Sequence, residues 1–334
     1  MDTHSFFAVC AIVLALGFDF VNGFHDTANA VSTVIETGAL PKRTAIIMCG
    51  VLNFVGAIFI GTTVAMTITK IISADLVSLH LVVSILIGGL IWNLLTWWFK
   101  LPISSSHCLI GAIFGAGFAA AGLSSVAWAE LDPVFLALLI SPAIGFISAA
   151  LVAFITKIAI ESPPAAPHTA NLRVLQIASS AFVSLAHGSN DGQKTMGIIT
   201  LILASQLGYT AKVIPLWVQI ATALAIGLGT MIGGERIINT VGKEISHVTL
   251  TSVHGFSAEF ATASVIMVAS HFGFPVSTTH TLSSAVAGAT VSLAGVKEIN
   301  FTTTRKILLA WFLTLPTAAL LAAVAFYCLK PFGI

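Results

Sequence analysis

Charged residues are scarce in this chain. Only 8% of its 334 residues are Asp, Glu, Lys or Arg, whereas soluble globular proteins carry about 25%. Hydrophobic residues make up 57% of the chain and gather in long runs. About 20 apolar residues let one helix cross the hydrocarbon core of a membrane. The composition therefore excludes an ordinary soluble domain. It predicts an all-α, polytopic membrane protein with segments near residues 5–24, 44–66, 79–99, 104–122, 134–158, 174–190, 191–207, 214–232, 253–272, 276–296 and 306–328.

Several features that would point to other functions are absent from the sequence. The net charge is +1 and no basic patch occurs, which argues against nucleic-acid binding. No Walker A sequence occurs, so ATP-driven transport by this chain alone is not expected. The cysteines lie far apart in apolar runs, without metal-binding or redox spacing: Cys10, Cys49, Cys108 and Cys328. We therefore expect no cofactor and no resident metal site.

One polar cluster occurs twice within these apolar surroundings. Residues 22–30 read Asn-Gly-Phe-His-Asp-Thr-Ala-Asn-Ala, and residues 187–194 read His-Gly-Ser-Asn-Asp-Gly-Gln-Lys. Each copy follows an apolar run and places a carboxylate, Asp26 or Asp191, where hydrocarbon is expected. An ionised Asp at the centre of a bilayer costs about 2.5–3.5 kcal/mol on insertion scales. A carboxylate at matching places in both halves therefore predicts a binding site.

A second motif also occurs twice, in the same order along the chain. Residues 102–107 read Pro-Ile-Ser-Ser-Ser-His, and residues 275–280 read Pro-Val-Ser-Thr-Thr-His. Motifs that recur at a nearly constant offset indicate an internal repeat. We expect a first transmembrane repeat over residues 1–160, a cytoplasmic linker over residues 161–172 and a second transmembrane repeat over residues 173–334.

The second repeat is expected to be inverted relative to the first. Each half has an odd number of expected spans, so the second half must enter the membrane the other way up. The loop at residues 297–306 carries Lys297, Arg305 and Lys306, whereas its counterpart at residues 122–132 carries no basic residue. The positive-inside rule then places both termini outside the inner (cytoplasmic) membrane. We therefore expect an inverted-topology repeat with re-entrant or broken helices.

The two proline motifs are typical of helix starts. A Pro followed by Ser or Thr begins a helix, whose first N–H groups are free and whose dipole is positive at that end. Such an end suits a phosphate-like oxyanion. We therefore expect the hydroxyls of both motifs to bind the substrate: Ser104, Ser105, Ser106, Ser277, Thr278 and Thr279. The alternative is ordinary capping of two membrane helices.

The two acids suggest that a cation accompanies the oxyanion. A carboxylate does not bind an anion unless a proton or a cation lies between them. Asp26 and Asp191 are therefore expected at both the substrate and the coupling ion, and Asn29 is expected at the substrate as a neutral donor. The other polar residues of the clusters are expected around the coupling ion: Asn22, His25, Asn190 and Lys194.

Each of these residues also has an explanation without a function. The acids and amides can simply satisfy one another, a buried histidine can serve packing, and a lysine at a helix end can snorkel to the membrane surface. Two further acids within apolar runs, Asp19 and Glu259, have no evident partner in the sequence.

Taken together, the four motifs resemble those of the Pit family of inorganic phosphate transporters. The likeness runs along nearly the whole chain and is closest to the bacterial low-affinity members at residues 22–31, 92–111 and 187–194. It implies secondary symport of phosphate, an all-helical inverted-repeat fold and a homodimer. It also implies that the site consists of Asp26, Asn29, Ser105, Ser106, Asp191, Thr278 and Thr279.

Departures from the family pattern bear on the coupling ion. Sodium-coupled members tend to repeat Asn-Asp-x-x-Asn in both halves, but here His25 replaces the first Asn of one copy and Lys194 the last Asn of the other. Histidine titrates near neutral pH, and a lysine can stand in for a bound cation. We therefore expect proton coupling, with sodium coupling as the alternative. The resemblance to the bacterial members also allows phosphate to enter as a neutral complex with a divalent metal ion.

Three other functions compete with phosphate symport. Sulfate or another tetrahedral oxyanion would fit the same helix starts, although a protonatable substrate favours phosphate. A channel or receptor without coupling is disfavoured, because fixed carboxylates repel an anion on a passive path. An intramembrane enzyme would use a serine beside a histidine, but symmetric duplication suits binding better than one reactive centre. We therefore expect a transporter without enzymatic activity.

Overall fold

The computed structural model describes residues 3–72, 74–125, 127–161, 169–209, 212–233 and 235–332. Over these ranges every regular element is a helix. Seven helices in this part of the chain are long and apolar enough to cross a membrane. The expectation of an all-α, polytopic membrane protein is therefore confirmed.

The helices fall into two successive groups. The first group is α1 (Thr3–Asp26), α2 (Ala28–Glu36), α3 (Lys42–Phe59), α4 (Thr63–Ile68), η1 (Ala74–Leu76), α5 (Leu79–Trp98), α6 (Ser105–Ala121), η2 (Gly122–Ser125) and α7 (Trp128–Glu161). The second group is α8 (Thr169–Leu207), α9 (Leu216–Ile232), α10 (Glu235–Asn239), the π-helical η3 (Thr240–Glu244), α11 (Ser252–His271), α12 (Thr278–Ala294), η4 (Val296–Glu298), α13 (Phe301–Leu329) and η5 (Lys330–Phe332). Most of the expected linker, residues 162–168, lies outside the described residues.

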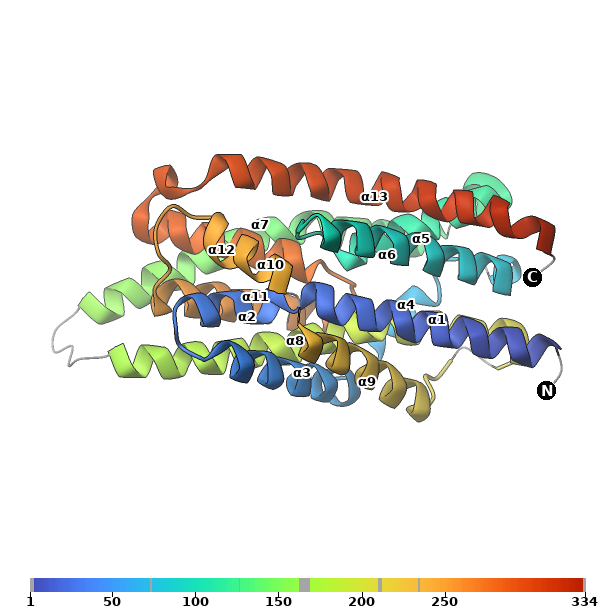
Figure 1. Ribbon diagram of the computed structural model, residues 1–334, viewed down its shortest axis with the longest axis horizontal. Coiled ribbons are helices and arrows are strands. Elements are labelled where there is room, and N and C mark those ends of the chain that lie inside the picture. The colour runs from blue at the N-terminus through green and yellow to red at the C-terminus, as the bar shows by residue number, and fades with distance from the viewer. Residues whose placement is uncertain are drawn as a thin grey trace.

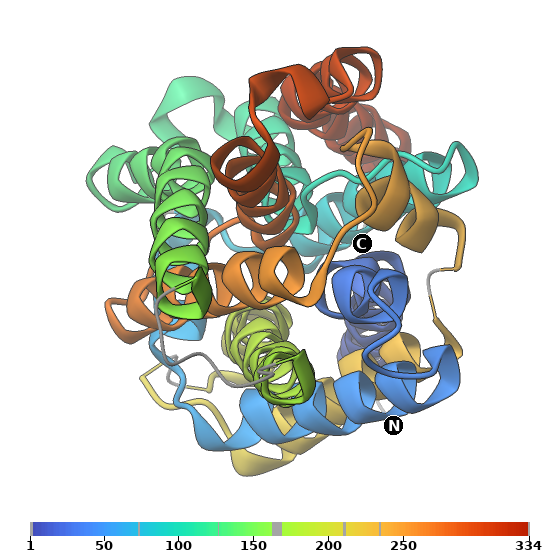
Figure 2. The same ribbon diagram turned by 90° about the vertical axis from the view of Figure 1, so that its left-hand side faces the viewer.

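The long helices run side by side along one axis of the molecule (Figure 1). α1 begins and α13 ends at one end of this bundle, whereas α7 ends and α8 begins at the other end. Figure 2 gives the view along that axis, in which helices of both groups surround the centre and α1 lies beside α8. The polar clusters on α1 and α8 are therefore brought together inside the bundle.

The second polar cluster lies within one uninterrupted helix. The expected division into segments 174–190 and 191–207 is wrong, because α8 continues through both. Residues 187–194 contain no proline, so the hydrogen-bond ladder of the helix need not break there. The first cluster differs, because the helix is interrupted at Thr27, between α1 and α2. Asp26 thus lies at a helix end, and its counterpart Asp191 lies in mid-helix.

α5 and α6 form a hairpin that covers only half of α13. His80 near the start of α5 lies with its Nε2 2.7 Å from the carbonyl oxygen of Phe326, near the end of α13. Beyond the end of α5, the carbonyl of Pro102 accepts a hydrogen bond of 3.0 Å from Trp311 Nε1, in the first half of α13. α6 then returns along α13. The hairpin therefore enters from the end of the bundle where α13 ends and turns back near the middle.

α11 and α12 form a matching hairpin against α7. Both of its helices contact α7, and Val253 at the start of α11 lines one cavity with Glu161, the last residue of α7. This hairpin therefore enters from the opposite end of the bundle. The two tips meet in the middle, where the Ser106 hydroxyl donates to the Val276 carbonyl at 2.6 Å.

Close packing of α6 on α13 depends on glycine. A Cβ atom added at Gly115 would collide with the backbone of Ala319, whereas one added at Gly17 in α1 would meet no heavy atom within 4 Å among the described residues. We expect Gly115→Ala to lower the free energy of unfolding by about 1–3 kcal/mol. Gly17→Ala is the matched control and should raise it by up to about 1 kcal/mol through helix propensity. Thermal unfolding of the purified protein in detergent measures both, and equal melting temperatures would contradict the backbone contact.

Candidate functional site

A buried polar site lies where α1 ends, where α6 and α12 begin, and midway along α8. The expected helix starts are confirmed, because α6 begins at Ser105 after the N-cap Ser104, and α12 begins at Thr278 after the N-cap Ser277. Each cap hydroxyl accepts a hydrogen bond from the backbone N–H three residues later, at 3.1 Å in both motifs. The caps fix the two helix starts at the tips of the opposed hairpins, so that the next hydroxyls face the acids.

Asp26 receives contacts from both repeated hydroxyl motifs. Ser105 donates to its Oδ2 at 2.9 Å, and Thr279 donates to its Oδ1 at 3.4 Å. His25 Nδ1 lies 3.0 Å from the same Oδ1. Asn29 completes this side, because its amide donates to Thr279 at 2.7 Å and to Thr278 at 3.4 Å. These side chains are at most 3% exposed, so the carboxylate depends on them in place of water.

Asp191 is joined to Asp26 through one hydroxyl. Ser105 Oγ lies 3.1 Å from Asp191 Oδ2 and 2.9 Å from Asp26 Oδ2. A hydroxyl has one proton, so it donates to only one of the two carboxyl groups at a time. The second carboxyl group can bond to Ser105 only as the donor, which requires a proton on that acid.

Lys194 supplies the positive charge of the site. Its Nζ lies 2.8 Å from Asp191 Oδ1 and donates to Ser106 Oγ at 2.5 Å. The side chain is 2% exposed and lies in the interior of α8. The alternative of a lysine that snorkels from a helix end is therefore wrong. Lys194 forms a buried ion pair beside the start of α6.

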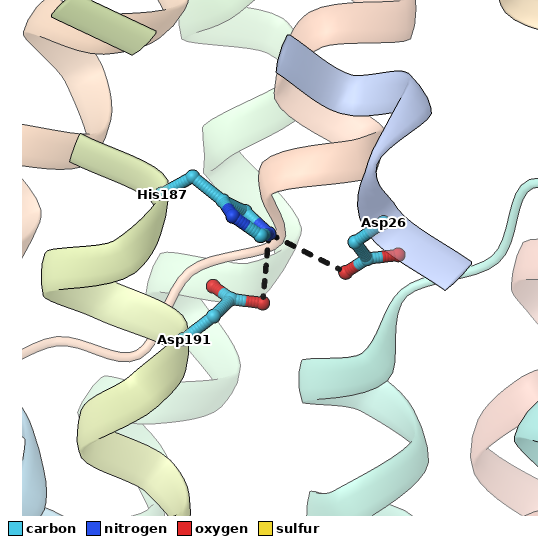
Figure 3. A group of neighbouring side chains, drawn as sticks. All are labelled: Asp26, His187 and Asp191. Carbon is cyan, nitrogen blue, oxygen red and sulfur yellow. Dashed lines mark ion pairs between the residues drawn. The ribbon is translucent and has the colours of Figure 1, made fainter. Parts of the chain in front are cut away.

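His187 lies between the two acids. Figure 3 shows its ring pointing from α8 toward both carboxylates, with Nε2 3.6 Å from Asp191 Oδ2 and 3.9 Å from Asp26 Oδ2. One ligand atom from each of these three residues lies within 4.8 Å of the others. At this spacing, one positive charge held among the three groups can interact with all of them.

A chain of hydrogen bonds fixes the orientation of His187. The Thr230 hydroxyl donates to the Ile226 carbonyl at 2.8 Å and accepts from the Asn53 amide at 2.8 Å. The oxygen of Asn53 therefore faces His187 Nδ1, 3.1 Å away. Since that oxygen is an acceptor, Nδ1 carries a proton, and Nε2 is the nitrogen that faces the acids. Nε2 is therefore the atom through which His187 can hold a proton against the two carboxyl groups.

His25 is held in a similar way. Its Nε2 lies 3.3 Å from Thr96 Oγ1, and that hydroxyl donates to the Trp92 carbonyl at 2.8 Å. Thr96 is therefore an acceptor for His25, and Nε2 carries a proton. Nδ1 then faces Asp26, where a second proton on the imidazole, or a proton on the acid, completes the hydrogen bond. Both histidines thus place a protonatable nitrogen against the paired acids.

Comparison with known proteins assigns the chain to a family. Residues 22–322 match the phosphate transporter family. The chain is 42% identical over 335 residues to the probable low-affinity inorganic phosphate transporter of Bacillus subtilis (strain 168), and the match covers 99% of both chains. It is 40% identical over 320 residues to the protein of the same description from Rhizobium meliloti (strain 1021), which covers 95% of this chain and 94% of the relative. The chain belongs to the phosphate transporter family.

A solved structure shares the fold of this member of the phosphate transporter family. That structure, of "The sodium-dependent phosphate transporter", matches with a TM-score of 0.83 at 24% sequence identity. The match covers 97% of this chain and 99% of the other. The structural match shows the fold, and the family match makes the chain a multi-pass membrane protein of a transporter family rather than an enzyme.

The remaining expected site residues of this family member lie around the cluster without touching the acids. Asn190 binds the tip of the α11–α12 hairpin, since its amide donates to Ser270 at 2.8 Å and its oxygen accepts from the Val276 N–H at 3.3 Å. Ser104 Oγ also lies 2.8 Å from His107 Nδ1. Asn22 is buried one turn before Asp26 in α1. Asn190 and Ser104 therefore position the hairpin tips that present the other hydroxyls.

The site contains residues that were not among the expected site residues, although one of them, His187, belongs to the second repeated cluster. His187 stands four residues before Asp191 and therefore on the same face of α8, which is the signal that could have identified it. Asn53 and Thr230 come from α3 and α9, outside all four motifs, and only the fold reveals them. Glu259, an acid without an evident partner in the sequence, accepts hydrogen bonds of 2.5 Å from Thr33 and Ser179.

Proposed function

We propose that this protein is a secondary active symporter that carries inorganic phosphate across the membrane, driven by a proton gradient. The observation that carries the proposal is the single Ser105 hydroxyl between Asp26 and Asp191, at the start of a helix whose next residue, Ser106, accepts a hydrogen bond from Lys194. The helix start supplies donors for an oxyanion. Asp26 and Asp191, which both face the Ser105 hydroxyl, can bind a proton.

The charges of the site favour loading of protons before the anion. Two carboxylates and Lys194 leave a net charge of −1 when both histidines are neutral, which repels phosphate. Protons on His25 and His187 would change that charge to +1. Since all these groups are buried, their mutual interactions are little screened by water. Phosphate would therefore enter favourably only with protons, which is the requirement for symport.

The substrate would bind between the two opposed helix starts. Ser105 and Ser106 of α6 and Thr278 and Thr279 of α12 present hydroxyls toward the same centre. In this structure several of those hydroxyls donate to the acids or to the backbone. A phosphate group would take over such donors and bring Lys194 close to its oxygens. If the cargo is a neutral divalent-metal phosphate, the metal ion enters as part of the substrate.

We also propose that the two halves of the chain are an inverted repeat in the inner membrane. The α5–α6 and α11–α12 hairpins enter from opposite ends of the bundle, which supports this relation, and α1 and α13 have their outer ends on one side (Figure 1). Residues 1–160 and 173–334 would form the two units. By the positive-inside rule, both termini lie outside and residues 161–172 lie in the cytoplasm.

Phosphate uptake into proteoliposomes tests the coupling ion. We expect accumulation of labelled phosphate under an inwardly directed proton gradient without sodium, and no accumulation under a sodium gradient at equal pH. Uptake that follows sodium and ignores the pH gradient would refute proton coupling. Competition by sulfate under the same gradient tests the alternative substrate, and equal transport of sulfate would refute selectivity for phosphate.

Loss of the Ser105 hydroxyl should weaken phosphate binding. Ser105→Ala removes one hydrogen bond to a charged group, which contributes about 1.5–3 kcal/mol. We therefore expect the half-saturating phosphate concentration to rise at least about tenfold, since 1.4 kcal/mol corresponds to a factor of ten. Ser124→Ala, at an exposed serine after α6, is the matched control and should leave uptake unchanged. Equal half-saturation in both variants would remove Ser105 from the substrate site.

A further inference from the structure

Asp19 is a buried acid outside the site described above. It lies on α1 two turns before Asp26 and is 0% exposed. Among the described residues, neither of its carboxylate oxygens has a hydrogen-bond partner. An ionised carboxylate without donors is among the most costly groups to bury in a protein. The position therefore requires either a ligand or a proton.

The neighbours of Asp19 are themselves short of partners. Asn22 Oδ1 on the next turn of α1 and Thr195 Oγ1 on α8 are both buried, and neither has a hydrogen-bond partner in the described part of the chain. Both side chains adjoin Asp19, and the charged groups that face it are Asp191 and Lys194 of α8. Three buried residues that carry unpartnered polar atoms thus lie together between α1 and α8.

One proton satisfies all of these atoms. Thr195 can donate its hydroxyl to one oxygen of Asp19, and a protonated Asp19 can donate its own O–H to Asn22 Oδ1. Without that proton, Asn22 Oδ1 has no donor among the described residues. We propose that Asp19 is a proton-binding site of its own, separate from Asp26 and Asp191, and that it releases its proton during transport.

The position of Asp19 suits an exchange with the main site. Asp19, Asn22 and Asp26 follow one another along one face of α1, and His187, Asp191 and Thr195 do so along α8 with four-residue spacing. The two helices contact each other, and Thr195 is adjacent to Lys194 in the chain. Asp19 is thus within the electrostatic reach of Lys194. A shift of this lysine from Asp191 toward Asp19 would favour loss of the proton.

Infrared spectroscopy of the full chain in lipid vesicles tests whether the proton is present. At neutral pH the wild-type protein should show the carbonyl stretching band of a protonated carboxylic acid, and Asp19→Asn should remove that component. Asn mimics the neutral acid, so this variant should keep the melting temperature. Thr195→Val should shift the band, because it removes the donor to the acid. Identical carboxylic-acid bands in wild type and Asp19→Asn would overturn the proposal, as would a cation-bound, ionised Asp19.

Phosphate addition tests whether the proton is released. We expect inorganic phosphate to reduce the Asp19 band in the wild type, and we expect vesicles with Asp19→Asn to take up one proton fewer per phosphate. If the variant does not transport, the phosphate-induced change in the wild-type band decides the question. An unchanged band together with an unchanged proton count would show a permanently bound proton and would refute the exchange. Only the release of the proton from Asp19 rests on the proposed proton coupling. The carboxylic-acid band of Asp19 can be measured without transport.

Discussion

Asp26→Asn is expected to lower proton-driven phosphate uptake at least a hundredfold while the protein stays folded. The acid accepts hydrogen bonds from Ser105 and Thr279 and faces His25 at 3.0 Å. An amide cannot take up a proton, so the variant cannot bind the coupling proton at this position. A hundredfold loss of uptake corresponds to about 3 kcal/mol. Asparagine has the same shape, so Ser105 keeps an acceptor and the packing persists.

The measurement is initial uptake of labelled phosphate into proteoliposomes under an inward proton gradient. Asp75→Asn is the matched control, because Asp75 is an exposed acid in η1, and it should transport like the wild type. A melting temperature close to that of the wild type establishes that Asp26→Asn is folded. Undiminished uptake by the folded variant would show that Asp26 takes no part in coupling.

The Asp191–Lys194 pair should produce the largest loss of stability. The two groups lie 2.8 Å apart and are at most 2% exposed. Removal of one partner leaves a buried charge without its counterpart, which costs about 3–5 kcal/mol. We therefore expect Asp191→Asn and Lys194→Met each to lower the free energy of unfolding by about that amount. The double variant should regain most of it, because both charges are then absent.

A double-mutant cycle, measured by unfolding in detergent, isolates the interaction free energy between Asp191 and Lys194 from the effects of each single substitution. The matched control is the pair of Lys243 and Glu36, which lies 3.6 Å apart with Lys243 59% exposed. Its single variants should each change stability by at most about 1 kcal/mol. Additive effects at Asp191 and Lys194 would contradict a direct buried interaction. The Asp191 and Lys194 variants are also expected to lose uptake, so the stability cycle is the decisive readout for this pair.

Local chemistry made much of the fold predictable. The starts of α6 and α12 were expected from Pro-x-Ser and are confirmed at Ser105 and Thr278, because a capping hydroxyl acts on the backbone three residues ahead. The expected break within residues 187–194 is wrong. Glycines and polar side chains weaken a helix, but packing of α8 among α1, α3, α9 and α11 keeps it continuous.

Re-entrant or broken helices were expected, but the sequence could not decide how deep the hairpins reach. α5 and α11 are apolar and long enough to cross a membrane, so length and hydropathy cannot distinguish a span from a hairpin arm. Contacts with α13 and α7 decide it, and they depend on backbone approach at glycines such as Gly115 and Gly145. Such contacts join residues from opposite halves of the chain and leave no periodic signal.

By itself the sequence determined the class of the protein, its family, and the residue types that its site contains. Those features follow from composition and from short motifs, whose physical chemistry is local. Only the tertiary structure decided that one hydroxyl, Ser105, bridges two acids from different halves, that Lys194 is buried in an ion pair, and that His187 faces both carboxylates. It also placed Asp19 beside Asn22 and Thr195. Hydrogen bonding and burial depend on distances between helices, and those distances are set by packing across the whole bundle.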